Sequence, residues 1–68
     1  MADFTLSWEA ARINAGMTQD DVSKAIHVSK ATIINWEKYR NHPTVVQAYA
    51  LCNLYGVSID MIDACRQG

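Results

Sequence analysis

Hydrophobic residues recur along this chain at steps of three and four positions, which is the spacing of one face of an α-helix. The alternation that is typical of strands is not sustained anywhere. The helical spacing, together with residues that cap or stop helices, divides the chain into five short segments. The predicted helices lie at about residues 5–15, from Thr18 to about Ile26, from Ser29 onward, from Pro43–Thr44 to Gly56, and from Ser58 onward.

Polar residues at the predicted helix starts support these boundaries. Thr18, followed three positions later by Asp21, is close to a capping box, and Thr44 with Gln47 completes a second one. Ser29 is the expected N-cap of the third helix. The positions expected to face inward are Trp8, Ala11, Ala15, Val22, Ala25, Ile26, Val28, Ile33, Trp36, Val45, Ala48, Leu51, Cys52, Tyr55, Ile59 and Ile62.

The lengths of the helices and of their connections predict the fold class. Helices this short, joined by only a few residues, pack at steep angles, because none is long enough for a parallel bundle. A chain of 68 residues forms one domain with one small core. We therefore expect an all-α, compact five-helix domain over residues 1–68, with its core at about residues 5–63.

The distribution of charge along the chain indicates a polyanionic partner, although the net charge does not. The formal net charge of −1 argues by itself against nucleic-acid binding, which is driven largely by neutralisation of phosphates. Residues 24–40, however, carry four basic residues and one acidic residue, whereas the rest of the chain carries two basic and six acidic residues. A basic middle between acidic flanks can orient a small domain on a polyanion.

Other features narrow the chemistry further. The two cysteines, Cys52 and Cys65, do not form a C-x-x-C pair, and His27 and His42 do not lie at zinc-ligand spacing with them, so we expect free thiols and no metal. No cofactor or small-molecule substrate is expected, because the sequence has no catalytic triad pattern and no phosphate-binding glycine loop. No apolar run is long enough for a membrane span, and the first residues do not form a signal peptide, so a cytoplasmic protein is expected.

The stretch from Thr18 to Glu37 has the composition of a helix-turn-helix. One short helix ends near Ile26, and about three residues later the next begins at Ser29. The small Ala25 is expected to let the two helices approach closely. Val28 and Ile33 are expected to fill the angle between them.

The outward face of the second of these helices carries side chains that can read base edges. Lysine donates to guanine, asparagine pairs with adenine, and alanine or the threonine methyl group contacts the thymine methyl. No acidic side chain lies on this face. It consists of Ser29, Lys30, Ala31, Thr32 and Asn35, with Lys38 at the end.

These residues resemble a known family. Over about residues 6–62 the sequence is similar to the lambda-repressor-like DNA-binding domains of the Cro/CI or XRE type. Each matching feature is weak alone, but their joint order and spacing is specific. The features are Arg12 before Gly16, Thr18-Gln19, Ala25, Val28-Ser29, Thr32-Ile33, Trp36-Glu37, a basic loop ending in Pro43, and Leu51 followed by Gly56-Val57-Ser58-Ile59-Asp60.

The resemblance implies that the third helix enters the major groove of double-stranded DNA and that the protein binds as a dimer. Gln19 would hold a backbone phosphate from the start of the second helix. Lys38 and Arg40, after the third helix, would also meet phosphates. Arg12 and Glu37 match a pair that ties the first helix to the third. The residues implied to face the bases are Ser29, Lys30, Ala31 and Asn35, and Thr32 is also expected to take part in DNA binding.

Two positions depart from the family pattern, which commonly has glycine at both. His27 stands in the turn, where the left-handed conformation that suits glycine is tolerable for histidine. Tyr39 follows Trp36-Glu37-Lys38, and tyrosine suits that conformation poorly, so we expect the end of the third helix to differ locally and to run about a turn longer. Ile34 beside the DNA face either touches a thymine methyl or is half-buried against the fourth helix.

The best sequence clues to self-association are Tyr49, Tyr55 and Met61, which we expect at a homodimer interface. The chain ends shortly after the fifth segment, which suggests a minimal Cro-like repressor of phage or mobile-element character. It would act by occluding an operator. The alternatives are an antitoxin of the same fold, which also binds a toxin, and a protein-interaction module that no longer binds DNA. An enzyme is not expected.

Overall fold

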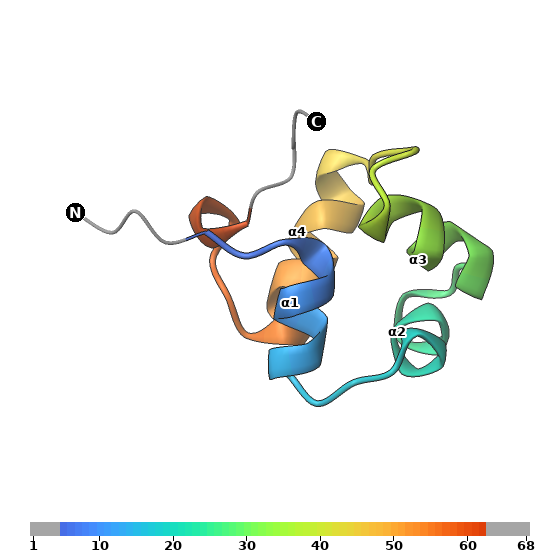
Figure 1. Ribbon diagram of the computed structural model, residues 1–68, viewed down its shortest axis with the longest axis horizontal. Helices are drawn as coiled ribbons and strands as arrows, with labels where there is room; N and C mark the ends of the chain where they lie inside the picture. Colours follow the sequence, from blue (N-terminus) through green and yellow to red (C-terminus); the bar gives the residue numbers. More distant parts are fainter. Residues whose placement is uncertain (1–4, 63–68) are drawn as a thin grey trace.

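Four α-helices and one short 3-10 helix make up the part of the chain that the computed structural model describes, residues 5–62 (Figure 1). The predicted all-helical class is confirmed, but the expectation of five helices is wrong, because the fifth segment forms a single 3-10 turn. The elements are α1 (Trp8–Asn14), α2 (Gln19–Ile26), α3 (Lys30–Glu37), α4 (Val45–Tyr55) and η1 (Ile59–Met61).

A pairing between the two ends of the described chain explains why the first and last segments are shorter than predicted. Leu6 and Ile62 form an isolated parallel bridge, and the Leu6 N–H donates to the Met61 carbonyl at 2.7 Å. Because the backbone is extended at Leu6, α1 begins only after Ser7. The Ser7 hydroxyl caps the helix by accepting from the Ala10 N–H at 3.1 Å. Extended backbone at Ile62 ends η1 after one turn.

The predicted caps are all present. Thr18 and Asp21 form a reciprocal capping box with hydrogen bonds of 3.0 and 3.1 Å, and Thr44 with Gln47 forms the other. The backbone hydrogen bond from Thr18 lowers the pKa of the Asp21 carboxyl. Ser29 caps α3 by accepting from the backbone N–H three residues on. These local signals fix the helix starts, since each satisfies a backbone donor that has no partner inside the helix.

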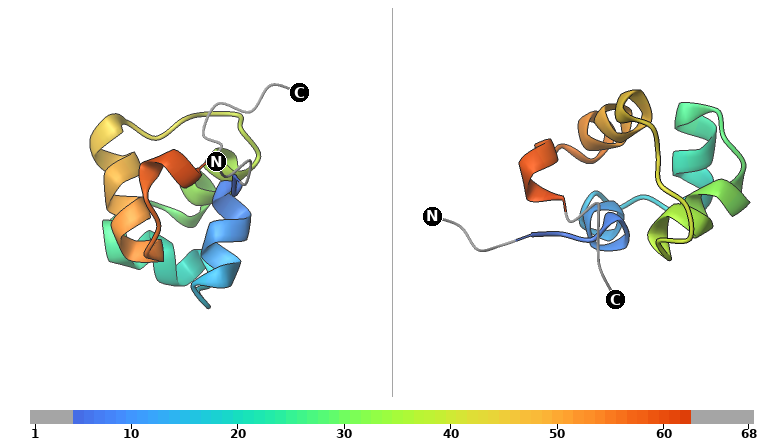
Figure 2. Two further views of the ribbon diagram at one scale, coloured as in Figure 1. Left: turned by 90° about the vertical axis from the view of Figure 1, so that its left-hand side faces the viewer. Right: turned by 90° about the horizontal axis from the view of Figure 1, so that it is seen from above.

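The helices enclose one core at the centre of the molecule. α1 contacts α3 and α4, α2 contacts α3 and α4, and η1 packs against α4. In two perpendicular views α2 and α3 lie together at one end, with η1 at the other (Figures 1 and 2). The buried residues are Leu6, Trp8, Ala11, Val22, Ser23, Ile33, Trp36, Leu51, Cys52, Tyr55 and Ile62.

Three sequence expectations about side-chain placement are wrong. Ala25 is exposed, and Val45 in the first turn of α4 is 72% exposed, because the inward face of α4 begins one turn later at the partly buried Ala48. Tyr55 is only 8% exposed and belongs to the core, so it cannot form part of a dimer interface. The helical spacing predicted that Tyr55 faces inward, and this prediction is confirmed. The prediction that Tyr55 lies at a dimer interface is wrong.

The remaining structural expectations concern the thiols and the membrane. Cys52 is a free, buried thiol, and burial raises its pKa. Cys65 lies outside the described residues. None of the helices within residues 5–62 has the length and apolar character needed to cross a bilayer.

Candidate nucleic-acid interface

The two helices of the predicted helix-turn-helix meet at a left-handed turn. His27 has φ 61° and ψ 46°, and this conformation ends α2. It turns the chain so that the Val28 N–H donates to the Ser23 carbonyl at 3.0 Å. Two residues beyond His27, Ser29 already caps α3. The expectation that His27 can replace glycine here is confirmed.

The small residue that α2 buries is Ser23, and not Ala25 as the sequence had suggested. Ser23 is 7% exposed, and its hydroxyl donates to the Asp20 carbonyl at 2.9 Å, so a small polar group is buried without an unsatisfied donor. Ile33 is 1% exposed, and Val28 packs against the same core, as predicted. Because Ser23 and Ala25 are both small, size alone could not predict which of them is buried. In the structure Ser23 lies next to buried Val22, whereas Ala25 faces outward.

α3 ends at Glu37, so the predicted extension of this helix is wrong. Lys38 is its C-cap, and Tyr39 adopts the left-handed conformation with φ 59°. The Tyr39 side chain packs against the core, which offsets the cost of this conformation for a residue other than glycine. The reversal allows the Arg40 N–H to donate to the Asn35 carbonyl at 3.0 Å.

The outward face of α3 is accessible along its first turn. Ser29, Lys30 and Ala31 are exposed, whereas Thr32 and Asn35 are half-buried. The hydroxyls of Ser29 and Thr32 lie 2.9 Å apart and hydrogen-bond to each other. Lys30 and Ala31 are therefore the base-reading candidates without a competing hydrogen bond in the described structure.

Asn35, near the C-terminal end of α3, has a side-chain partner that the sequence did not indicate. Its Oδ1 accepts a hydrogen bond from Nη1 of Arg40 at 3.3 Å. Arg40 and the neighbouring Lys38 are both exposed. Arg40 thus lies folded back toward α3 and does not extend freely from the loop.

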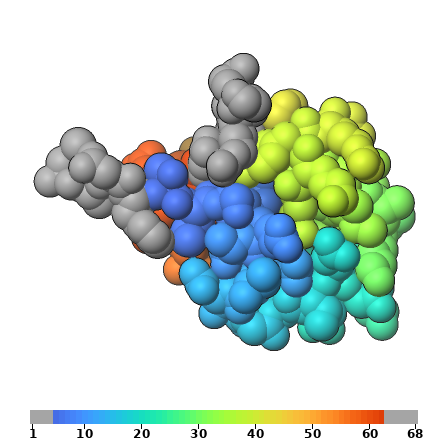
Figure 3. All heavy atoms as spheres, in the orientation of Figure 1, coloured from blue at the N-terminus to red at the C-terminus, as the bar shows by residue number. Residues whose placement is uncertain are grey.

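Glu37 at the end of α3 joins three parts of the chain. Its carboxylate accepts from Nε of Arg12 at 2.7 Å and from Nε2 of Gln19 at 2.9 Å. Nη1 of Arg12 also donates to the Met17 carbonyl at 2.9 Å. The Arg12–Glu37 pair that the resemblance implied is present, and the Gln19 contact is an addition. In the space-filling view, α1 and the end of α3 meet along the middle of one face (Figure 3).

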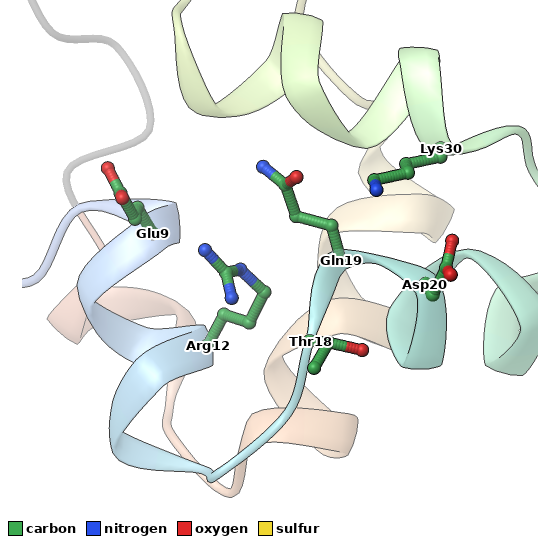
Figure 4. Close-up of a pocket in the computed structure, with 6 residues that line it drawn as sticks. All are labelled: Glu9, Arg12, Thr18, Gln19, Asp20 and Lys30. Carbon is green, nitrogen blue, oxygen red and sulfur yellow. The ribbon is translucent and has the colours of Figure 1, made fainter.

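A polar hollow of about 560 Å³ opens beside this cluster. In the close-up, Arg12 and Gln19 point into the space between α1 and α3, with Lys30 on the far side (Figure 4). The acidic Glu9 and Asp20 also line it, so its charge is mixed. The hollow lies where α1, the start of α2 and the start of α3 come together, which places Gln19 and Lys30 on one side of the molecule.

Other residues singled out in the sequence lie away from this face or beside it. Tyr49 and Met61 are exposed, at 54% and 37%. Ile34 is half-buried, and it is not among the hydrophobic residues that pack against the core cluster. Trp36 is 4% exposed and belongs to the core, as its inward position predicted.

Comparison with known proteins agrees with this architecture. The model of a helix-turn-helix family (HTH_3) matches residues 9–62, which include all four helices except the first residue of α1. No curated protein and no solved structure matches the chain.

Proposed function

We propose, from the premise that this chain belongs to the XRE-type, lambda-repressor-like helix-turn-helix family of DNA-binding regulators, that it is a repressor that binds a palindromic operator. α3 would lie in the major groove, with its first turn against the base edges. A dimer on the operator would block access of the polymerase. We further propose that the repressor originates from a phage or mobile element.

The observation that carries this proposal is the chemistry of the exposed side of α3. Lys30 and Ala31 are open to solvent, and a lysine beside a small apolar residue suits a guanine next to a thymine methyl. The acidic residue of α3, Glu37, is 6% exposed and paired with Arg12, so its charge does not oppose an approaching phosphate backbone. α3 and its C-cap therefore present exposed basic residues and no exposed acidic residue of their own, although Glu9 and Asp20 lie beside Lys30.

Backbone contacts would come from the two ends of this surface. One N–H of the Gln19 carboxamide is bound to Glu37, and its second N–H remains available to a phosphate oxygen. Lys38 and Arg40 are exposed beyond the end of α3 and would approach the backbone on the other side. Because few basic residues are available to contact phosphates, we expect the affinity for DNA to fall with salt concentration at the slope of a small number of phosphate contacts.

The proposed dimer would use the exposed side of α4. Val45, Val46 and Tyr49 are 72%, 79% and 54% exposed, and Tyr49 lies four and three positions after the two valines, which is the spacing of helical neighbours. α4 contains no charged residue, so two copies of this helix can meet without repulsion or burial of a charge. Tyr49 thus keeps the role expected of it and Met61 remains a candidate, whereas the buried Tyr55 is replaced by the two valines.

The test of the proposal is selection of bound duplexes from a random pool at about 50 mM salt, where phosphate contacts are favoured. The wild type is compared with the Lys30→Ala/Asn35→Ala double variant. A matched control, Lys24→Ala/Asn53→Ala, removes the same residue types from exposed positions on α2 and α4. We expect a palindromic site that is lost in the first variant and kept in the second.

The exposed apolar side of α4 also supports a second candidate, a protein-interaction module or an antitoxin whose partner covers Val45, Val46 and Tyr49. No enrichment of any duplex by the wild type would exclude the repressor and favour the protein-interaction module. A partner protein that competes with duplex binding would identify the antitoxin.

A further inference from the structure

Arg40 contacts Asn35 through both its backbone and its side chain. The Arg40 N–H donates to the Asn35 carbonyl at 3.0 Å, and Nη1 donates to Oδ1 of Asn35 at 3.3 Å. The left-handed conformation of Tyr39 produces this reversal, and the Tyr39 side chain is anchored against the core. The position of Arg40 beside Asn35 is thus built into the way α3 ends.

This contact changes what the Asn35 side chain can offer to a base. A free asparagine pairs with adenine by accepting from N6 through Oδ1 and donating to N7 through Nδ2. In this structure a guanidinium cation lies on Oδ1, and it repels the partly positive amino group of an adenine. The Nδ2 donors of Asn35 remain available, and so do N–H donors of Arg40.

We infer that Arg40 is a specificity-determining residue, because its guanidinium beside Oδ1 disfavours adenine opposite Asn35 and makes the two side chains a donor-rich pair that prefers guanine. Guanine presents two acceptors, N7 and O6, in the major groove, and cytosine presents only a donor. One lone pair of Oδ1 accepts from Arg40 and the other lies beside its positive charge, so the pair of Asn35 and Arg40 offers mainly donors to the base opposite. This inference rests on the proposed binding of α3 to DNA, and it assigns Arg40 a role beyond a phosphate contact.

The test compares two variants that each remove one exposed positive charge and keep an unbranched apolar stem. Arg40→Met removes the donor to Asn35, and Lys38→Met is the matched control two residues away. Duplex selection with Asn35→Ala identifies the base position that depends on Asn35. We expect guanine there for the wild type and for Lys38→Met. For Arg40→Met we expect a shift toward adenine of about tenfold, the discrimination of one good bidentate contact.

A third arm shows whether Arg40 acts through Asn35. In an Asn35→Ala background, Arg40→Met should no longer change the preference at that position, because the group it controls is absent. Circular dichroism of each variant confirms that the helices are intact.

The possible failures are distinguishable. If the wild type enriches a site but Arg40→Met lowers affinity equally for all sequences, as Lys38→Met should, then Arg40 contacts phosphate only and this inference is overturned. An adenine preference of the wild type at the position of Asn35 also overturns it. If the wild type enriches no site, the proposed repressor function fails as well.

Discussion

Glu37 at the end of α3 accepts a hydrogen bond from Nε of Arg12 in α1 at 2.7 Å, across 25 residues of sequence. Both side chains are largely buried, with 12% and 6% of their surfaces exposed. The hydrogen bond to Glu37 raises the pKa of Arg12 above its already high ordinary value, so Arg12 keeps its positive charge. Its geometry fixes the end of the proposed recognition helix relative to α1.

Removing one member of this pair should destabilise the domain strongly. Arg12→Met leaves the Glu37 carboxylate largely buried without a cation, and loss of one partner of a buried pair costs about 3 kcal/mol or more. Urea unfolding followed by circular dichroism measures this cost. The double variant Arg12→Met/Glu37→Leu should recover most of the stability, because it leaves no unpaired charge. A cost below about 1 kcal/mol for the single variant would instead indicate a solvated surface pair.

Glycine at position 27 should stabilise the domain. His27 is exposed and has φ 61°, a conformation that costs residues other than glycine about 1 kcal/mol or more. His27→Gly should therefore raise the free energy of unfolding by about 1 kcal/mol and the Tm by about 4–8 °C. His27→Ala is the control and should show no such gain, since alanine meets the same steric cost. Equal stability of the two variants would contradict this account.

The stability of the domain should decrease at alkaline pH because of Tyr55. Burial, with the nearby Glu37 carboxylate, raises the pKa of Tyr55 well above its ordinary value. Above pH about 10 the unfolded chain loses this proton while the folded chain keeps it, so rising pH favours unfolding. The ordinary pKa of tyrosine is about 10, so the relevant range is roughly pH 9 to 11. Over this range the urea midpoint of Tyr55→Phe should decline less steeply than that of the wild type. An identical pH dependence of the two proteins would show that Tyr55 ionises normally.

Self-association should depend on the exposed side of α4. Val46 is 79% exposed, so Val46→Glu should leave the fold intact but place a charge at the centre of the proposed interface. Sedimentation at micromolar concentration should show a dimer for the wild type and a monomer for the variant. Ile13→Glu, at a 58% exposed position on α1, is the matched control and should remain dimeric. A monomeric wild type, with and without operator DNA, would exclude this interface.

The sequence predicted the starts of α2, α3 and α4 correctly, but it did not predict the start of α1 or the end of α3. Thr18, Ser29 and Thr44 act within one turn of the backbone groups they cap, so their effect is visible in the order of residues. The end of α3 was predicted wrongly because tyrosine suits a left-handed conformation poorly. The packing of Tyr39 against the core, which only the folded chain provides, outweighed that preference.

The same distinction separates the parts of the candidate site. Lys30 and Ala31 could be placed on the outer face of α3 from helical periodicity alone, because periodicity is a local property. The hydrogen bonds of Gln19 with Glu37 and of Arg40 with Asn35 could not be predicted, since each depends on how separate segments approach one another. These contacts determine which donors and acceptors remain available to DNA.

The sequence by itself determined the helical class, the starts of α2, α3 and α4, most of the core and the face of α3 that can meet DNA. Each of these follows from interactions between residues within a few positions of one another. Tertiary structure alone decided that the last segment stops after one turn, where Leu6 pairs with Ile62, and that α3 ends at Glu37, where Tyr39 packs against the core. Those outcomes depend on contacts between residues distant in sequence, whose energies exceed the small local preferences that the sequence reveals.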